Sequence, residues 1–371
     1  MIFTFVVSTA TALAFGFVPA RQASQVDPHA ALRERTRRAT SDRRQHHVGR
    51  VLVVTEVALA VLLLVGAGLL LRTLSSVASV DLGFQPADTL TMGLFLGLRP
   101  PQARSAIIDQ ILDRVEDVPG VKAAGTIQFP PLRGMTCGTG FWLEEQAASR
   151  DPSRTLPTEC ALVSRGYYFA AMGIPVLDGR PFDRRDRIAS PRVLVVNQSF
   201  VKRYCPDGRG LGRRILVQGS NQALAEIVDV VGDVRHMGLT SNPAPTLFLL
   251  HAQTPGYITT LVVRTSGDPV GHAPAIRRAI HEVDPTQAVS GVGTIEQDVA
   301  KMLARPRLQA TLVTCFALIA VVLAVIGVYG LIAYVVTLRT HEIGIRLALG
   351  ATREKVFVGL LGRVHSSCSL A

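Results

Sequence analysis

Residues 51–71 read VLVVTEVALAVLLLVGAGLLL, twenty-one residues that carry a single charge, at Glu56. As an α-helix this stretch is about 31 Å long, which matches the hydrocarbon core of a bilayer. Residues 308–338 carry no charge, and as a helix they are about 46 Å long, which exceeds that core. We therefore predict two membrane-spanning helices, the second of which tilts or continues beyond the bilayer as a stalk. Helices buried inside a large soluble protein are the alternative.

The composition of the 371-residue chain agrees with membrane segments. Its hydrophobic fraction is 48%, its charged fraction is 18% and its mean hydropathy is +0.31, which is too apolar for an ordinary soluble enzyme. Of its 39 basic residues 35 are arginine, and eight of these lie in residues 19–50 against three acidic residues. A basic run beside an apolar helix, without interleaved aromatic residues, is typical of a cytoplasmic loop. This pattern argues against nucleic-acid binding, because the sequence has no recognisable nucleic-acid-binding motif beside the basic residues.

The arginine bias also predicts the orientation of the chain. Residues 72–307 are close to charge balance, with 26 basic against 22 acidic side chains, so we place them outside the cytoplasm. Residues 1–18 are apolar with no basic residue before them, which favours a helix over a cleaved signal peptide, although both stay open. The predicted order is the end of a transmembrane helix (1–18), a cytoplasmic Arg-rich linker (19–50), a transmembrane helix (51–71), an extracytoplasmic domain (72–307), a transmembrane helix or stalk (308–338) and a cytoplasmic segment (339–371).

Three of the five cysteines, Cys137, Cys160 and Cys205, fall in the predicted extracytoplasmic domain. An odd number allows at most one disulfide among them, and the sequence does not say which two residues form it. Cys315 lies in the second predicted membrane helix and Cys368 in the C-terminal segment.

The two ends of the extracytoplasmic domain repeat one pattern, a strand, a helix and a second strand. The first unit has strands at 89–98 and 121–129 on either side of apolar residues at helical spacing between 107 and 118. The second unit has a strand at 259–265, a helix at 269–283 and a strand at 288–292. Two such β-α-β units predict an α+β fold with one split sheet, into which everything between them is inserted as a second lobe.

The inserted stretch, residues 130–251, is rich in strand patterns and poor in helical ones. We predict strands at 160–164, 193–197, 215–218, 226–231 and 246–250. After the second unit, Thr294 is placed to cap a helix over 294–303 whose first turn holds Glu296 and Asp298. The pair Arg305-Pro306 predicts a break between this helix and the second membrane helix.

The sequence holds no pattern that predicts catalysis. A P-loop needs a lysine after a glycine, and none of the four lysines follows one, so we expect that the chain is not its own ATPase. Zinc-protease, paired-cysteine and serine-nucleophile motifs are also missing. His281 and Glu282 point to different faces of a helix, which disfavours a metal site with Asp284, and Gly291-x-Gly293 indicates a turn. We expect no enzyme activity, no cofactor and no metal.

Glu56 lies near the cytoplasmic end of the first predicted membrane helix. A carboxylate in hydrocarbon is costly, so a role in transport is one hypothesis. The other, which we favour, is a side chain that snorkels to the interface or pairs two helices. In the second helix four residues are small enough to let a neighbouring helix approach closely, namely Ala320, Ala324, Gly327 and Gly330.

Residues 339–356 read RTHEIGIRLALGATREKV and follow the second predicted membrane helix. This segment resembles the cytoplasmic signature of the MacB-like or FtsX-like permeases of ABC transporters, a pattern close to R-x-x-E-I-G-I-R-x-A-L-G-A. Further stretches similar to that family lie at 65–74, 81–86, 118–121, 230–239 and 303–307. The resemblance extends from about Phe15 to Leu361 and is to the duplicated-permease type.

In that family the matching segment is a coupling helix that docks on a separate ATPase subunit, and the outside domain has a porter-like and a β-rich lobe. The resemblance implies a permease subunit of an ATP-driven export or mechanotransmission system, paired with a second permease unit in the lipid bilayer of the bacterial cytoplasmic (inner) membrane. A membrane-anchored regulator of an extracytoplasmic partner, such as a cell-wall hydrolase, is the alternative. The implied ATPase-coupling residues are Arg339, Glu342, Ile343, Gly344, Arg346, Leu347, Ala348 and Gly350. An amphipathic helix on the lipid surface is the other interpretation of this segment.

The chain departs from the family pattern at its two ends. The family's permease module has four membrane helices per unit, whereas the last residues here, GLLGRVHSSCSLA, lose the apolar pattern. The first residues resemble the end of a preceding module. We therefore expect the chain to be a fragment that is not a competent transporter by itself.

Overall fold

The structure is a computed structural model that describes residues 38–338, apart from 98, 134, 136, 165–166, 220–222 and 255. The chain divides into two units, one made of residues 1–68 and 312–371 and the other of residues 69–311. The segments predicted at 1–18 and 339–371, and the first part of the predicted linker, lie outside the described residues.

Both predicted spans lie within two long helices. Helix α2 runs from Arg38 to Ala78, and α7 runs from Ile295 to Leu338. Within them, Val51–Ala78 and Ile295–Ala333 are long and apolar enough to cross a membrane. Helix α2 extends beyond residues 51–71 at both ends, and α7 begins well before residue 308, because hydropathy marks the surroundings of a helix and not the extent of its backbone hydrogen bonding.

The break predicted at Arg305-Pro306 is wrong. Pro306 lies inside α7, which continues without interruption. A proline removes one backbone donor from a helix, but Leu303 before it and Ala310 after it are both buried. This packing on either side outweighs the local preference of the proline.

The first turn of α7 agrees with the prediction. Oγ1 of Thr294 accepts a hydrogen bond from the N–H of Gln297 at 3.1 Å, and Oε1 of Gln297 accepts one from the N–H of Thr294 at 3.3 Å. This is a reciprocal capping box. Glu296 and Asp298 lie in the same turn, where the helix dipole favours negative charge.

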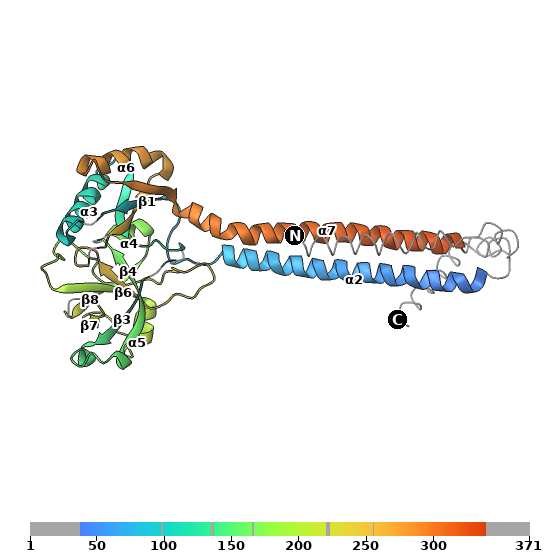
Figure 1. The fold of residues 1–371 in the computed structure, drawn as a ribbon, viewed down its shortest axis with the longest axis horizontal. Coiled ribbons are helices and arrows are strands. Elements are labelled where there is room, and N and C mark those ends of the chain that lie inside the picture. The colour runs from blue at the N-terminus through green and yellow to red at the C-terminus, as the bar shows by residue number, and fades with distance from the viewer. Residues whose placement is uncertain are drawn as a thin grey trace. The chain divides into compact units, whose positions relative to one another are not determined.

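The two predicted β-α-β units form one antiparallel sheet in the order β11-β1-β10-β2. The first unit is β1 (Thr89–Phe95), α3 (Pro101–Glu116) and β2 (Val121–Ile127), and the second is β10 (Ile258–Thr265), α6 (Pro269–Val283) and β11 (Val289–Thr294). Because β10 lies between β1 and β2, the units interleave as the split sheet that we predicted. Helices α3 and α6 pack against each other and against this sheet (Figure 1), over a core that includes Leu94, Ile111 and Ile280.

The stretch between the two units was predicted only in part. All five predicted strands are present, as β4 (Leu156–Val163), β6 (Arg192–Asn197), β7 (Arg214–Val217), β8 (Ala225–Val231) and β9 (Thr246–Leu250). The sequence did not predict β3 (Cys137–Leu143) and β5 (Val176–Gly179). Nor did it predict the short helices α4 (Tyr167–Met172) and α5 (Gln198–Tyr204), or the single turns η2 (Glu144–Gln146) and η3 (Pro152–Arg154).

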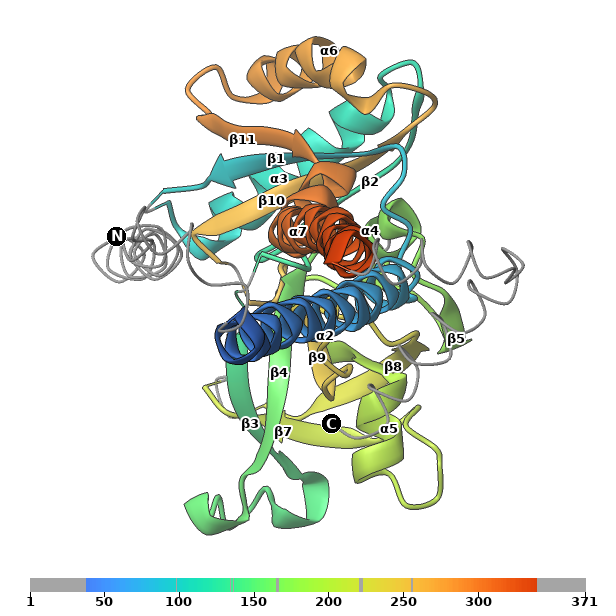
Figure 2. The same cartoon turned by 90° about the vertical axis from the view of Figure 1, so that its right-hand side faces the viewer.

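Six strands between the two units close into a ring. Several of these strands are seen together in Figure 2. Successive strands pair in the order β4-β3-β7-β8-β6-β9, and β9 returns to pair with β4 in parallel. Closure leaves these strands without free edges. A cluster that includes Phe141, Leu194 and Phe200 packs against them. No signal in the sequence predicted this closure.

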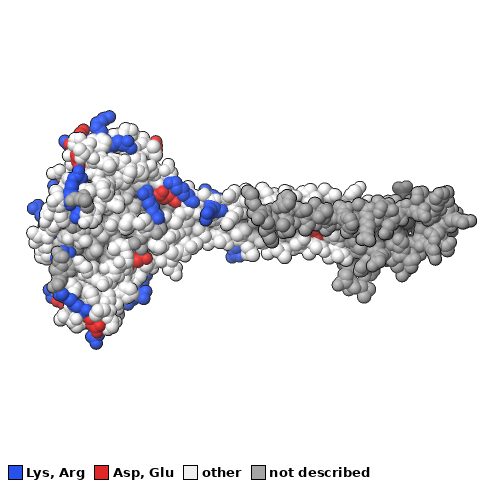
Figure 3. Space-filling model, viewed as in Figure 1, with Lys and Arg blue, Asp and Glu red and all other residues white. Residues whose placement is uncertain are grey.

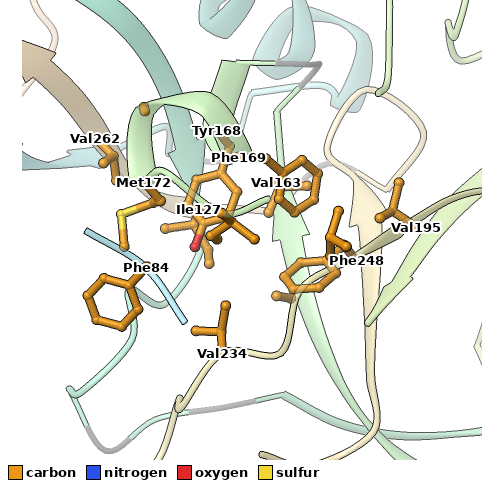
Figure 4. Close-up of a cluster of buried hydrophobic side chains, with 14 of the residues drawn as sticks. Phe84, Ile127, Val163, Tyr168, Phe169, Met172, Val195, Val234, Phe248 and Val262 are labelled. Carbon is orange, nitrogen blue, oxygen red and sulfur yellow. The ribbon is translucent and has the colours of Figure 1, made fainter. Parts of the chain in front are cut away.

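The ring and the split sheet share one hydrophobic core. β2 and β4 join them through a single pair, Ile127 opposite Val163. Around this pair, one buried cluster joins Phe248 of β9 in the ring and Val262 of β10 in the split sheet with Phe169 of helix α4 (Figure 4). The inserted lobe is therefore packed into the same compact unit as the sheet that it interrupts.

Cys137 and Cys160 face each other across β3 and β4 and form a disulfide. Cys205 is a buried free thiol, and burial raises its pKa. One disulfide among these three cysteines agrees with the sequence count. Because disulfides persist in oxidising compartments, this bond favours an extracytoplasmic location for the domain.

Candidate functional site

The described parts of α2 and α7 in the first unit bury only one narrow stripe each. Along α2 the stripe includes Val53, Glu56, Ala60, Leu63 and Ala67, at alternating spacings of three and four residues. Side chains at this spacing form the seam of a coiled coil. The two helices therefore pair along one line, with the rest of each helix surface left uncovered.

Glu56 lies directly against Gly327 in this seam. A Cβ atom placed on Gly327 would be 2.7 Å from Oε2 of Glu56 and 3.8 Å from a methyl carbon of Val53. The missing side chain of the glycine thus leaves the space that the Glu56 carboxyl group fills. The parts of α2 and α7 that lie in this unit and whose side chains the structure describes are residues 51–68 and 312–333. Glu56 is the only charged residue among them.

Small residues continue the seam on either side of this contact. Counting along the antiparallel helices from Glu56 and Gly327 brings Ala60 opposite Ala324 and Ala67 opposite Ala317, and all four alanines are buried. Alanine and glycine at such positions let two helix backbones approach closely. The packing role predicted for Ala324 and Gly327 is therefore confirmed.

Gly330 does not contact the described part of α2, and its predicted packing against another helix stays a prediction. A Cβ atom placed on Gly330 would meet nothing within 4 Å among the described residues, because the position of the seam that follows Gly327 is the half-buried Leu331, four residues on. Ala320 is half-buried. For Glu56, the contact with Gly327 favours the helix-pairing hypothesis, and a role in transport stays untested.

The outer faces of the two helices are apolar and exposed. Leu62, Val325 and Tyr329 are 69%, 65% and 73% exposed, and the described helix surface in Figure 3 is almost free of charge, unlike that of the domain. Soluble proteins rarely expose a continuous apolar surface of this kind. A helix pair whose backbone bonds are satisfied internally and whose outside is apolar is suited to lipid.

A cleft of about 520 Å³ lies in the domain beside the first turns of α7. The loop residue Arg133 crosses it to reach Asp298 of α7, with Nε 3.0 Å from Oδ2, and its Nη2 donates to Oγ1 of Thr91 at 3.0 Å. Lys301 lies 3.4 Å from the same carboxylate. Leu132, before Arg133, has a φ of +69°, a conformation that is strained for a branched side chain.

These contacts tie the start of α7 to β1 and to the 130–136 loop. The sequence did not single out Arg133, because its partner Asp298 is 165 residues away and no local pattern links the two. The arrangement connects α7, the loop that holds Arg133, and β1. These contacts do not place a nucleophile beside a general base.

The side chains that we considered as metal ligands have other partners. Nε2 of His281 lies 3.2 Å from the carbonyl oxygen of Gln287. Asp284 accepts a hydrogen bond from Nη2 of Arg99 at 2.6 Å, and its pKa is lowered, chiefly by a hydrogen bond from Thr286. The turn predicted at Gly291-x-Gly293 is wrong, because both glycines lie inside β11. Gly291 has a φ of +57°, and the pairing of β11 with β1 shifts register there, as at a β-bulge, which a glycine accommodates. Among the described residues no group of three potential ligands could hold a metal ion.

The eight residues assigned to the ATPase-coupling helix are not brought to any site by the structure. Arg339, Glu342, Ile343, Gly344, Arg346, Leu347, Ala348 and Gly350 all lie outside the described residues. Their role therefore stays a prediction from the sequence.

Comparison with known proteins gives two groups of similar chains. No protein-family model matches the sequence. The chain is 26% identical over 211 residues to the macrolide export ATP-binding/permease protein MacB of Campylobacter jejuni, covering 54% of this chain and 32% of that protein. It is 26% identical over 197 residues to MacB of Hahella chejuensis, covering 51% of this chain and 30% of that protein. The match thus spans about a third of the length of these relatives.

Two solved structures are similar at 13% identity. The periplasmic region of MacB from Actinobacillus actinomycetemcomitans matches with a TM-score of 0.39 over 58% of this chain and 92% of that chain. The extracellular domain of the noncanonic ABC-type transporter YknZ from Gram-positive bacteria matches with a TM-score of 0.35 over 55% of this chain and 100% of that chain. The matches in sequence support the resemblance to MacB/FtsX-like ABC permeases.

Proposed function

We propose that this chain, as a relative of MacB/FtsX-like ABC permeases, is the permease component of an ATP-driven export or mechanotransmission system. One observation carries the proposal: the paired helices α2 and α7 have exposed apolar outer faces, and the chain between them folds as a disulfide-bonded α+β domain. Such a chain would sit in the bacterial inner membrane with residues 72–307 on the periplasmic side. It would have no ATPase activity of its own and would depend on a separate ATPase subunit and a second permease unit.

The proposed mechanism uses α7 as the moving part. Binding of ATP to the partner would bring two coupling segments together at residues 339–356. Because α7 has no break from Ile295 to Leu338, the displacement would pass along one helix to the Arg133–Asp298 contact. Glu56 is the only charge in the described seam, which favours mechanical transmission to periplasmic cargo or partners over passage of a polar substrate between the two helices.

We predict that the coupling segment controls hydrolysis on the partner. In membranes that contain the chain, a second permease unit and a MacB-like ATPase, Gly344→Leu and Glu342→Lys should lower permease-stimulated ATP hydrolysis by roughly tenfold, a coupling loss of the size typical between distant sites. Thr340→Ala, a change in the same segment outside the signature, should leave the rate unchanged. Equal rates in all four forms would argue against a coupling helix.

A deletion of the chain in cells, together with capture of partners by the isolated domain, separates export from regulation. If deletion of the chain leaves export intact and the domain captures a cell-wall hydrolase, the regulator hypothesis is correct. An export defect with no captured hydrolase supports the exporter.

A further inference from the structure

Arg104, on the first turns of α3, is a buried cation with no acidic partner among the residues that the structure describes. The residue is 4% exposed, and its Cζ lies 4.2 Å from the centre of the Tyr257 ring. Its Nε and Nη1 atoms are buried without a hydrogen-bond partner among the described residues. A guanidinium group is charged at every relevant pH, so burial does not neutralise it.

A buried charge of this kind is costly unless an opposite charge accompanies it. Arg99, five residues earlier, meets that requirement with Asp284 at 2.6 Å. Arg114, on the same helix as Arg104, lies 3.4 Å from Glu282. No comparable carboxylate lies at Arg104 in the part of the chain that the structure describes, although the stacked Tyr257 ring offsets part of the cost.

His251, which is near enough to Arg104 for the two groups to interact electrostatically, adds a donor and no negative charge. Nε2 of His251 accepts a hydrogen bond from the N–H of Gly256 at 3.2 Å, so the neutral ring carries its hydrogen on Nδ1. That Nδ1 atom is buried without a described partner, and so is Oγ1 of Thr259, two residues after Tyr257. Burial, together with the nearby charge of Arg104, lowers the pKa of His251 to about 4.

We propose that Arg104, with His251 and Tyr257, forms a binding site for a small oxyanion, a carboxylate or a phosphate. The Arg104 N–H groups and the Nδ1–H of His251 donate to its oxygens, and Tyr257, a residue that is 54% exposed, covers the Arg104 side of the site with its ring. The segment 251–257 is the chain that leads from β9 of the ring to β10 of the split sheet. An anion held here links α3 to that segment and stiffens the joint between the two groups of strands. This inference does not depend on the proposed transport function.

The test is thermal unfolding of the full chain in detergent at constant ionic strength, with chloride exchanged for phosphate or acetate. Phosphate and acetate can also stabilise proteins nonspecifically, so the readout is the difference between variants. The wild-type midpoint should rise by roughly 3 °C or more with the bound anion. Arg104→Gln should lose this rise, whereas Arg114→Gln, which removes an exposed arginine of the same helix, should keep it.

If Arg104→Gln does not fold, Tyr257→Ala provides the second variant, since removing the cover should weaken anion binding several-fold in a calorimetric titration with phosphate. A larger effect of phosphate than of acetate, or the reverse, identifies the preferred anion. The proposal would be overturned if the anions raised the unfolding midpoint equally in the wild type and in the Arg104 variant. A titration without detectable binding would also overturn it, because water would then solvate the guanidinium group.

Discussion

Replacing Gly327 by leucine should separate α2 from α7. The leucine side chain needs the space that the Glu56 carboxyl group and Val53 occupy, where even a Cβ atom would lie 2.7 Å from Oε2. Gly327→Ala should be mild, because the end of a flexible glutamate can move aside. Overpacking of this kind costs about 1 to 3 kcal/mol, and we expect the loss to appear as reduced disulfide cross-linking between cysteines introduced at Ala60 and Ala324.

Two variants make this prediction specific. Gly330→Leu adds the same side chain one turn further along α7, where a Cβ atom meets nothing within 4 Å, and it should leave cross-linking unchanged. Glu56→Ala combined with Gly327→Leu should recover much of the cross-linking, because the alanine vacates the contested space. If Gly327→Leu and Gly330→Leu behave alike, the seam is not where the structure places it.

Replacing Asp229 by asparagine should stabilise the domain at neutral pH. Asp229 is fully buried on β8, between β5 and β6. Burial raises the pKa of its carboxyl group to about 6, and neither carboxyl oxygen has a hydrogen-bond partner among the described residues. The folded state therefore holds the proton more tightly than the unfolded state, so stability falls as pH rises from 3.8 through 6. The asparagine does not titrate, and at pH 7.5 we expect a gain of about 2 kcal/mol.

The measurement is chemical unfolding of both forms from pH 4 to pH 7.5. The difference between them should be small at pH 4 and largest above pH 7. His236 and His251, whose pKa values burial lowers to about 4, destabilise both forms alike at acidic pH and cancel in the difference. Asp178→Asn, a change at an exposed neighbour on β5, should have little effect. A gain that does not vary with pH would contradict the assignment of the shift to Asp229.

Local patterns predicted the elements of this fold better than their assembly. The strands and helices of both β-α-β units, and the cap at Thr294, follow from periodicity and turn residues that lie next to one another in the chain. The closure of the ring through β4 and β9 depends on pairs such as Ala161 and Phe248, which are far apart in sequence and have no pattern of their own. The continuity of α7 through Pro306 likewise depends on buried neighbours that a local rule does not see.

For the candidate site, too, the sequence indicated individual residues but not the contacts between them. An isolated carboxylate in an apolar helix and small residues in another indicated that Glu56 and Gly327 are special, because both depart from their own surroundings. Their apposition needed the structure, since it depends on the register of the two helices. Arg104 gave no signal, because an arginine on an amphipathic helix is usually exposed, and only its burial against Tyr257 distinguishes it.

The topology of the chain is the most direct test of the central claim, that α2 and α7 cross the membrane and that residues 72–307 lie outside the cytoplasm. Gly219 is exposed, has a φ of +78° and has open space around it, so it accepts an inserted reporter. A reporter that is active only outside the cytoplasm should be active at Gly219, and one that is active only in the cytoplasm should be silent there. A strong cytoplasmic signal at Gly219 would contradict the account.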